Sequence, residues 1–207
     1  DLCWEGVVRA MRVRGRASAA SEVDKRQVDG VYQDIVDVLK PGVRENEIVA
    51  LANKRLYEMG SDQVEAVNAI SGERCNPHPH NFTDRLIRPG DQAFFDIIHS
   101  YNGYRTCYYR TFGVGSATQS QRDAYKQARE WMDRSIEAIQ PGVGSDQIAR
   151  LLPKAEDFGF ENEMAAFGLQ FAHGLGLGFH ERPILSRLNS RDNPDDWAAG
   201  WGLSMER

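Results

Sequence analysis

The stretch that decides the fold runs from Val28 to Gly42 and reads VDGVYQDIVDVLKPG. Its apolar residues recur at intervals of three and four, which predicts an amphipathic helix with one buried stripe. The stripe ends at Pro41-Gly42, because proline cannot continue the backbone hydrogen-bond ladder of a helix. The members of the stripe are Val28, Val31, Tyr32, Ile35, Val38 and Leu39.

The same pattern returns 100 residues later, where the sequence reads AREWMDRSIEAIQPG from Ala128 to Gly142. The register continues without a gap through the pairs Val43 and Val143, Ile48 and Ile148, Leu51 and Leu151, Lys54 and Lys154. A solenoid needs at least three such repeats, so two copies favour two pseudo-symmetric halves packed against each other. Chance is the alternative, since helix–Pro-Gly–helix connections are common.

A second helix is expected after each Pro-Gly pair. Its start is capped by Glu45 or Asn46 in the first copy and by Ser145 or Asp146 in the second. Its end lies near Gly60 in the first copy and near Gly159 in the second.

Two strands follow in each copy. Their predicted ranges are Ala93–His99, Tyr104–Phe112, Gln170–His180 and Leu203–Glu206. Turn residues at Pro89-Gly90 and Asn102-Gly103 bound the first two. The order is therefore ααββ twice, which predicts the α+β class.

Composition narrows the class of protein. Of 207 residues, 41% are apolar and 27% are charged, with a net charge of −5, as in ordinary globular proteins. No run approaches the ~20 apolar residues that cross a bilayer, the start shows no signal-peptide pattern, and no basic cluster suits nucleic acid. The basic residues from Arg9 to Arg16 suit a solvated helix face or linker better than a phosphate site.

The cysteines indicate a reducing compartment. Cys3, Cys75 and Cys107 are odd in number and lack CxxC spacing, which argues against a disulfide framework or a zinc knuckle. The expected localisation is the cytoplasm.

Asp96 stands at the centre of an apolar strand. An ionised carboxylate there costs several kcal/mol unless it is paired or bound to a metal, so Asp96 is either a functional residue or half of a buried structural pair. His78 and His80 lie between prolines in an extended loop, which is either part of a site or an ordinary polar surface loop.

Glycines alternate between His173 and His180, which lets the backbone approach a ligand and brings both imidazoles near it. A phosphate-cradling loop is the rival interpretation. It is weak because the spacing is not GxGxxG and Pro183 stands where a helix would begin, so no nucleotide cofactor is expected.

Together these motifs resemble the creatinase, prolidase and aminopeptidase P family, whose methionine aminopeptidase relatives share its pita-bread fold. HGLG…HERP from His173 to Pro183 is similar to the family's His-Gly-Ile-Gly…His-Glu-x-Pro. NGYRTCYYRTF from Asn102 to Phe112 is similar to its Gly-Tyr-x-Ser/Thr-Asp-x-Thr-Arg-Thr strand.

The resemblance implies a domain plan. Residues 1–25 are a lead-in segment and residues 26–207 are a pita-bread catalytic domain. Its halves, about 26–115 and 120–207, surround a curved antiparallel sheet, with the chemistry between them. The family's last glutamate strand and an N-terminal domain lie outside the sequence, so we expect the domain to be truncated at its C-terminal end.

The resemblance also implies residue roles. The metal ligands would be Asp96, His173 and Glu206, the catalytic residues His80, His180 and Glu206, and the substrate contacts His78, Tyr104 and Arg110. Carboxylates and imidazole suit Mn, Fe, Co or Zn.

Three positions depart from the family pattern. Cys107 replaces the second aspartate, Tyr109 replaces a threonine and Arg207 replaces a proline. A thiolate can ligate zinc or ferrous iron but does not bridge two hard cations as a carboxylate does. We therefore expect a weakened or absent dinuclear metal site, with Cys107 as a doubtful ligand.

The expected function is hydrolysis of a C–N bond of amide type in a small substrate by histidines and carboxylates, as creatinase does without a metal. Tyr104, Tyr108, Tyr109 and Trp201 would line a pocket for an onium or guanidinium group. The alternatives are a metal-dependent Xaa-Pro peptidase, a metal-using lyase resembling dimethylsulfoniopropionate lyases, and a non-catalytic binding module. The expected partners are a small molecule or dipeptide and a second copy of the chain in a homodimer.

Overall fold

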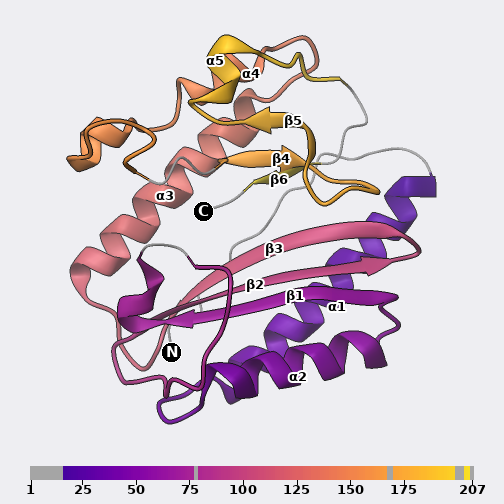
Figure 1. The fold of residues 1–207 in the computed structure, drawn as a ribbon, viewed down its shortest axis with the longest axis vertical. Coiled ribbons are helices and arrows are strands. Elements are labelled where there is room, and N and C mark those ends of the chain that lie inside the picture. The colour runs from indigo at the N-terminus through magenta and orange to yellow at the C-terminus, as the bar shows by residue number, and fades with distance from the viewer. Residues whose placement is uncertain (1–15, 77–78, 167–169, 199–202, 206–207) are drawn as a thin grey trace. The chain divides into compact units, whose positions relative to one another are not determined.

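The computed structural model describes residues 16–76, 79–166, 170–198 and 203–205 (Figure 1). Two compact units divide the chain: one contains Gly15–Arg122 and the other Asp123–Arg207. None of the helices in the described ranges is long and apolar enough to span a membrane. The elements are α1 (Arg16–Val38), α2 (Glu45–Glu58), β1 (Gln63–Ser71), the 3₁₀ helix η1 (Gly72–Cys75), β2 (Gln92–Tyr101), β3 (Tyr104–Gly113), α3 (Gln119–Ala138), α4 (Ser145–Ala149), the 3₁₀ helix η2 (Ala155–Phe158), β4 (Ala172–Gly174), β5 (Glu181–Leu185), α5 (Asn189–Asp192) and β6 (Leu203–Met205).

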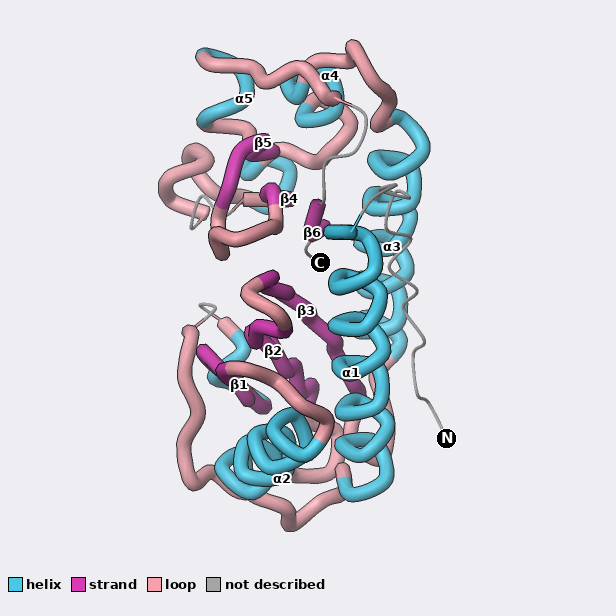
Figure 2. Tube along the Cα trace, turned by 90° about the vertical axis from the view of Figure 1, so that its right-hand side faces the viewer, coloured by secondary structure: helices cyan, strands magenta, loops and turns pink. Residues whose placement is uncertain are grey.

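The first unit packs two helices on one face of an antiparallel sheet with the order β1-β2-β3 (Figure 2). The stripe predicted on α1 is its buried face, since Val28, Val31 and Ile35 have no exposed surface. The Tyr32 hydroxyl shares its proton between the carbonyl oxygens of Phe95 and Tyr108, each 2.7 Å away. This contact ties α1 to two strands at once.

The second unit has a smaller antiparallel sheet with the order β5-β4-β6. Its core combines residues of α4, β4, β5 and the connecting segments, namely Ile139, Ile148, Ala149, Leu152, Ala172, Leu185 and Trp197. The predicted α+β class is confirmed in both units.

The sequence repeat is also a repeat of hydrogen bonds. Gly42 and Gly142, both at positive φ, donate their N–H groups to Ile87 and Trp197 at 2.8 and 2.9 Å. The carbonyls of Val43 and Val143 accept the return bonds from the same two residues, at 2.9 and 3.1 Å. Each Pro-Gly turn is therefore joined to a later segment by the same pair of backbone hydrogen bonds.

The first unit contains a strand that was not predicted, so its order is ααβββ and not ααββ. β1 pairs with β2 along its length, but the register shifts between Val64 and Ala66. This irregularity interrupts the alternation of apolar and polar residues by which a strand is found in a sequence.

The second helix of the second copy is much shorter than predicted. α4 ends at Ala149, whereas a 3₁₀ turn, η2, reaches the predicted stop at Gly159. Pro153 explains the difference, because it has no N–H to donate to the carbonyl of Ala149, and the first copy has Asn53 at the matching position.

The predicted caps, Glu45 or Asn46 and Ser145 or Asp146, were wrong by one or two residues. Arg44 precedes α2, and its backbone N–H donates to the Glu47 carboxylate at 2.8 Å. Gly144 precedes α4 and has no side chain to cap with.

The predicted strand from Gln170 to His180 was too long. Only Ala172–Gly174 forms β4, and the glycines after it form bends before β5, a strand that was not predicted. Leu203–Met205 forms β6 as expected. Glu206, at the predicted end of that strand, lies outside the described residues.

Candidate functional site

In the first unit, strand register places Asp96 between Asn68 and Tyr109. Asp96 is the direct partner of Asn68 on β1 and of Tyr109 on β3. Directly paired residues project from the same face of a sheet, so these three side chains share one face. Cys107 belongs to the same face because it lies two residues before Tyr109 on β3.

Asp96 has no exposed surface, and both of its carboxylate oxygens accept hydrogen bonds from neutral side chains. The Asn68 amide donates to one oxygen at 2.9 Å, and the Cys107 thiol donates to the other at 3.7 Å. These bonds offset part of the cost of burying a carboxylate. Asn68 was missed in the sequence because its strand was missed.

His80 is exposed and lies beside Tyr109. Its Nε2 is 3.3 Å from the Tyr109 hydroxyl, within hydrogen-bonding reach. Tyr109 stands where the family pattern has a threonine. Here the larger side chain reaches the loop histidine, which a threonine hydroxyl close to the strand does not do. His78 lies outside the described residues.

Arg110 and Tyr108 lie on the opposite face of β3, against α1. The Arg110 guanidinium carbon sits 5.0 Å from the centre of the Tyr108 ring and 5.5 Å from that of Tyr32. Tyr104 is on this face too, by the alternation of the strand. In this position Arg110 helps to hold α1 on the sheet, and the substrate roles of Arg110 and Tyr104 stay predictions.

In the second unit, His173 is a buried residue of the central strand β4. Its Nδ1 is 2.9 Å from the carbonyl oxygen of Gly174, and a carbonyl only accepts, so Nδ1 carries the proton. The tautomer of the neutral ring is thereby set. Such a contact on the second nitrogen is typical of histidines that bind metals.

His180 is exposed and lies next to His173. The two imidazole centres are 4.3 Å apart in an edge-on arrangement, and the Phe179 ring stacks on His180 at 4.1 Å. The two imidazoles of the glycine-rich segment are therefore neighbours, and their approach to a ligand stays a prediction.

Contacts within the chain require glycine at two positions of this segment, because a Cβ would collide with neighbouring atoms. A Cβ at Gly174 would lie 2.5 Å from the carbonyl oxygen of Arg182, and one at Gly178 would lie 2.7 Å from the Glu181 carboxylate. The Gly178 N–H donates to that carboxylate. The close backbone approach therefore accommodates Glu181, which the sequence had not marked as a partner of the loop.

Among the described residues, no three histidine, cysteine, aspartate or glutamate side chains form a group that could hold a metal ion. Glu206 and Trp201 lie outside that part of the chain. Cys107 acts as a hydrogen-bond donor to Asp96, a role that needs the thiol and not the thiolate that ligates metals. The described residues thus do not supply a complete donor set for a metal ion.

Comparison with known proteins places these motifs in a family. The sequence pattern of metallopeptidase family M24 matches residues 22–200. The Xaa-Pro dipeptidase of Pyrococcus furiosus is 29% identical over 174 residues, which are 82% of this chain and 47% of that protein. The chain spans about half the length of the curated relatives it matches.

Solved structures agree with this assignment. Dipeptidase PepE from Mycobacterium ulcerans superposes with a TM-score of 0.79 at 25% identity, over 94% of this chain and 51% of that one. Prolidase from Pyrococcus furiosus has the same TM-score at 23% identity, over 94% and 56%. The pita-bread fold expected from the sequence is therefore confirmed, and the chain belongs to metallopeptidase family M24.

Proposed function

We propose that the chain is a hydrolase that cleaves a C–N bond of amide type in a small substrate, with His80 and His180 as its acid–base groups. The observation that carries the proposal is the pair of imidazoles in the second unit, where an exposed His180 adjoins a buried His173 of set tautomer. Imidazole gains and loses a proton near neutral pH, so it suits proton transfer to a leaving amine. The relatives named Xaa-Pro dipeptidase act in this class of reaction.

The donors around Asp96 support a weakened metal site in this proposal. Asn68 and the Cys107 thiol already occupy its two oxygens, and the family's second aspartate is absent. In the metal-free reaction expected from the sequence, carboxylates would instead hold a cationic group of the substrate.

The second candidate is a metal-dependent Xaa-Pro peptidase. The Gly174 carbonyl on His173 Nδ1 favours it, because it directs the other ring nitrogen to act as the ligand. Asp96, His173 and Glu206 would hold Mn, Fe, Co or Zn in this case, with Cys107 as a fourth donor to a soft ion. The bound ion would activate water for attack on the amide carbon.

Metal analysis of the purified full-length protein separates the two candidates. We expect fewer than two equivalents of Mn, Fe, Co or Zn per chain, and activity that EDTA leaves unchanged. Two equivalents, together with EDTA-sensitive cleavage of proline dipeptides, would establish the peptidase and overturn the first candidate.

A substrate panel tests catalysis itself. Proline dipeptides, creatine-like amides and onium compounds are assayed with the wild type and with His180→Ala, which should lose 100-fold or more in turnover, on the order of a lost acid–base group. His180 is exposed, so the free energy of unfolding should change little. If the wild type binds one of these compounds but turns over none of them, the chain is a binding module. Release of an alkene from an onium compound would indicate the lyase.

The variant Cys107→Asp tests whether the cysteine at this position is what weakens metal binding. It restores the carboxylate that the family pattern has at this position, and we expect tighter binding of Mn or Zn in calorimetric titration. The isosteric Cys107→Ser is the control and should bind no better than the wild type. Equal affinities in all three proteins would mean that Cys107 does not limit metal binding.

We further propose a cytoplasmic homodimer. The cysteine pattern supports the reducing compartment, since the three cysteines of the sequence lack CxxC spacing. Light scattering after size exclusion measures the mass of the assembly, and a mass of one chain at all concentrations would contradict the dimer.

A further inference from the structure

Glu45 is a charged residue with no exposed surface, at the first position of α2. Its Oε1 accepts hydrogen bonds from the backbone N–H and the hydroxyl of Ser71, each at 2.8 Å. Its Oε2 accepts from the backbone N–H of Thr83 at 2.9 Å and from the Thr83 hydroxyl at 2.8 Å, and it is paired with the Arg74 guanidinium. A carboxylate with five donors is stable without water.

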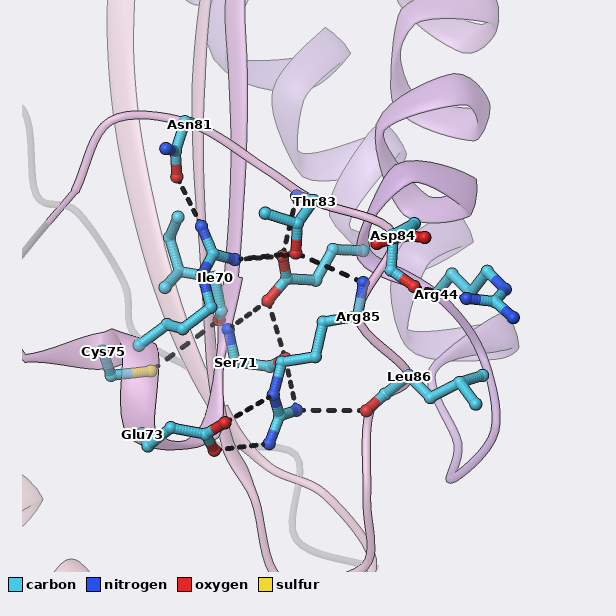
Figure 3. A network of polar contacts seen from close by, with 12 residues as sticks. Arg44, Ile70, Ser71, Glu73, Cys75, Asn81, Thr83, Asp84, Arg85 and Leu86 are labelled. Carbon is cyan, nitrogen blue, oxygen red and sulfur yellow. Dashed lines mark hydrogen bonds and ion pairs between the residues drawn. The ribbon is translucent and has the colours of Figure 1, made fainter.

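The donors belong to the two ends of one loop. Ser71 is the last residue of β1, where the loop begins. Thr83 lies near the other end of the loop, beside the start of α2 (Figure 3). Backbone bonds reinforce the closure, since the Glu45 and Asn46 N–H groups both donate, at 3.1 Å, to carbonyls of Arg85 and Thr83. Glu45 therefore closes the base of the loop that carries His80.

A second set of contacts reaches the residue next to His80. The Arg74 guanidinium that pairs with Glu45 also donates to the Asn81 side chain at 2.6 Å, and Figure 3 shows Asn81 pointing toward this network. The Asn81 carbonyl accepts from the Ala69 N–H of β1 at 3.1 Å. A chain of short contacts thus runs from Glu45 through Arg74 to Asn81.

Arg85 makes a further set of charged contacts with residues of the loop and its flanks. Arg85 pairs with Glu73 at 2.7 Å and with Asp91 at 2.6 Å, and it donates to the Ser71 hydroxyl at 2.9 Å. The Arg85 guanidinium holds the pKa of Glu73 at about 2. Charged hydrogen bonds therefore hold both sides of the loop.

We propose that Glu45 is a positioning residue for His80: through Arg74 and Asn81 it fixes the loop so that the His80 imidazole stays beside the Asp96 face of the sheet. The proposal rests on the proposed catalytic role of His80. Glu45 does not touch the imidazole; it acts through the loop backbone. The second copy has Ser145 at the position that matches Glu45, so it lacks this buried carboxylate.

The test is a double-mutant cycle of Glu45→Gln and His80→Ala, assayed on the substrate that the wild type turns over. A misplaced catalytic group costs on the order of 10- to 100-fold in kcat, so Glu45→Gln should show a loss of this size with a smaller change in KM. In the His80→Ala background the same substitution should have no further effect. Glu65→Gln is the matched control, because it removes a carboxylate paired with Arg105 in the same unit but remote from the loop, and it should keep full activity.

Asn81→Ala is the second variant, since Asn81 is exposed and its replacement leaves Glu45 paired. It should reproduce the coupled loss in kcat if Glu45→Gln does not fold. An independent readout is the ¹⁵N imidazole resonance of His80, which should shift in Asn81→Ala and Glu45→Gln and stay unchanged in Glu65→Gln.

Two results would overturn the positioning role: wild-type kcat in the folded variants, or the same loss in kcat with and without His80. Full activity of His80→Ala is a different result. It would refute the catalytic role of His80 in the proposed function, and the resonance shift would still report whether Glu45 fixes the loop.

Discussion

Replacement of Arg187 by methionine should destabilise the second unit more than any surface substitution. The Arg187 side chain is almost fully buried, and one guanidinium nitrogen donates to the carbonyls of Ala149 and Leu152 at 2.9 and 2.7 Å. Both carbonyls lie at or just after the end of α4, which stops at Ala149 before Pro153. The guanidinium is also paired with Glu163 at 2.7 Å.

The size of the effect follows from these contacts. A hydrogen bond from a charged donor contributes about 1.5–3 kcal/mol, and removal of one partner from a buried ion pair costs about 3–5 kcal/mol. Methionine recovers part of this loss by apolar burial, since it fills most of the same volume. The expected decrease in the free energy of unfolding is therefore about 3–5 kcal/mol for Arg187→Met.

Urea denaturation measures the change, and hydrogen exchange locates it, because the amides of residues 150–152, 154 and 155 should lose protection first. Arg150→Met is the matched control: this arginine follows α4, its side chain is 70% exposed, and it pairs with Asp146, so its loss should cost less than about 0.5 kcal/mol. Equal effects of the two substitutions, or a loss below about 1 kcal/mol for Arg187→Met, would refute the account of how α4 ends.

Three further predictions concern the first unit. Tyr32→Phe removes the hydroxyl that bridges β2 and β3 and should lower the free energy of unfolding by about 1–3 kcal/mol in urea. Burial raises the pKa of Tyr32 well above its ordinary value, so wild-type stability should fall as the pH rises above about 10, and the phenylalanine variant should lack that Tyr32 contribution. Arg85 lowers the pKa of Glu73 to about 2, so the stability from this pair is present above the ordinary pKa of 4.5 and is lost as the pH falls toward 2; Glu73→Gln should flatten that part of the acid unfolding curve, and an unchanged curve would contradict it. Tyr109→Phe removes the hydroxyl 3.3 Å from His80 and should lower kcat several-fold and shift the pH profile of activity, whereas an identical profile would mean that this hydrogen bond has no catalytic effect.

The sequence by itself determined the features that depend on neighbouring residues. The stripe of α1, its end at Pro41 and the repeat at Pro141 follow from helical periodicity and from the missing proline N–H, both of which are local properties. The central carboxylate of β2, Asp96, was conspicuous for the same reason, since it interrupts an apolar run.

Only the tertiary structure decided which distant groups meet. Asn68 faces Asp96 because of a strand register that a local irregularity hides, and Arg187, 38 residues beyond Ala149, donates to the carbonyl at the end of α4. Glu45, predicted as a helix cap, instead closes the loop of His80. Hydrogen bonds between segments far apart in the chain leave no periodic trace in the sequence, so their partners become visible only when the chain is folded.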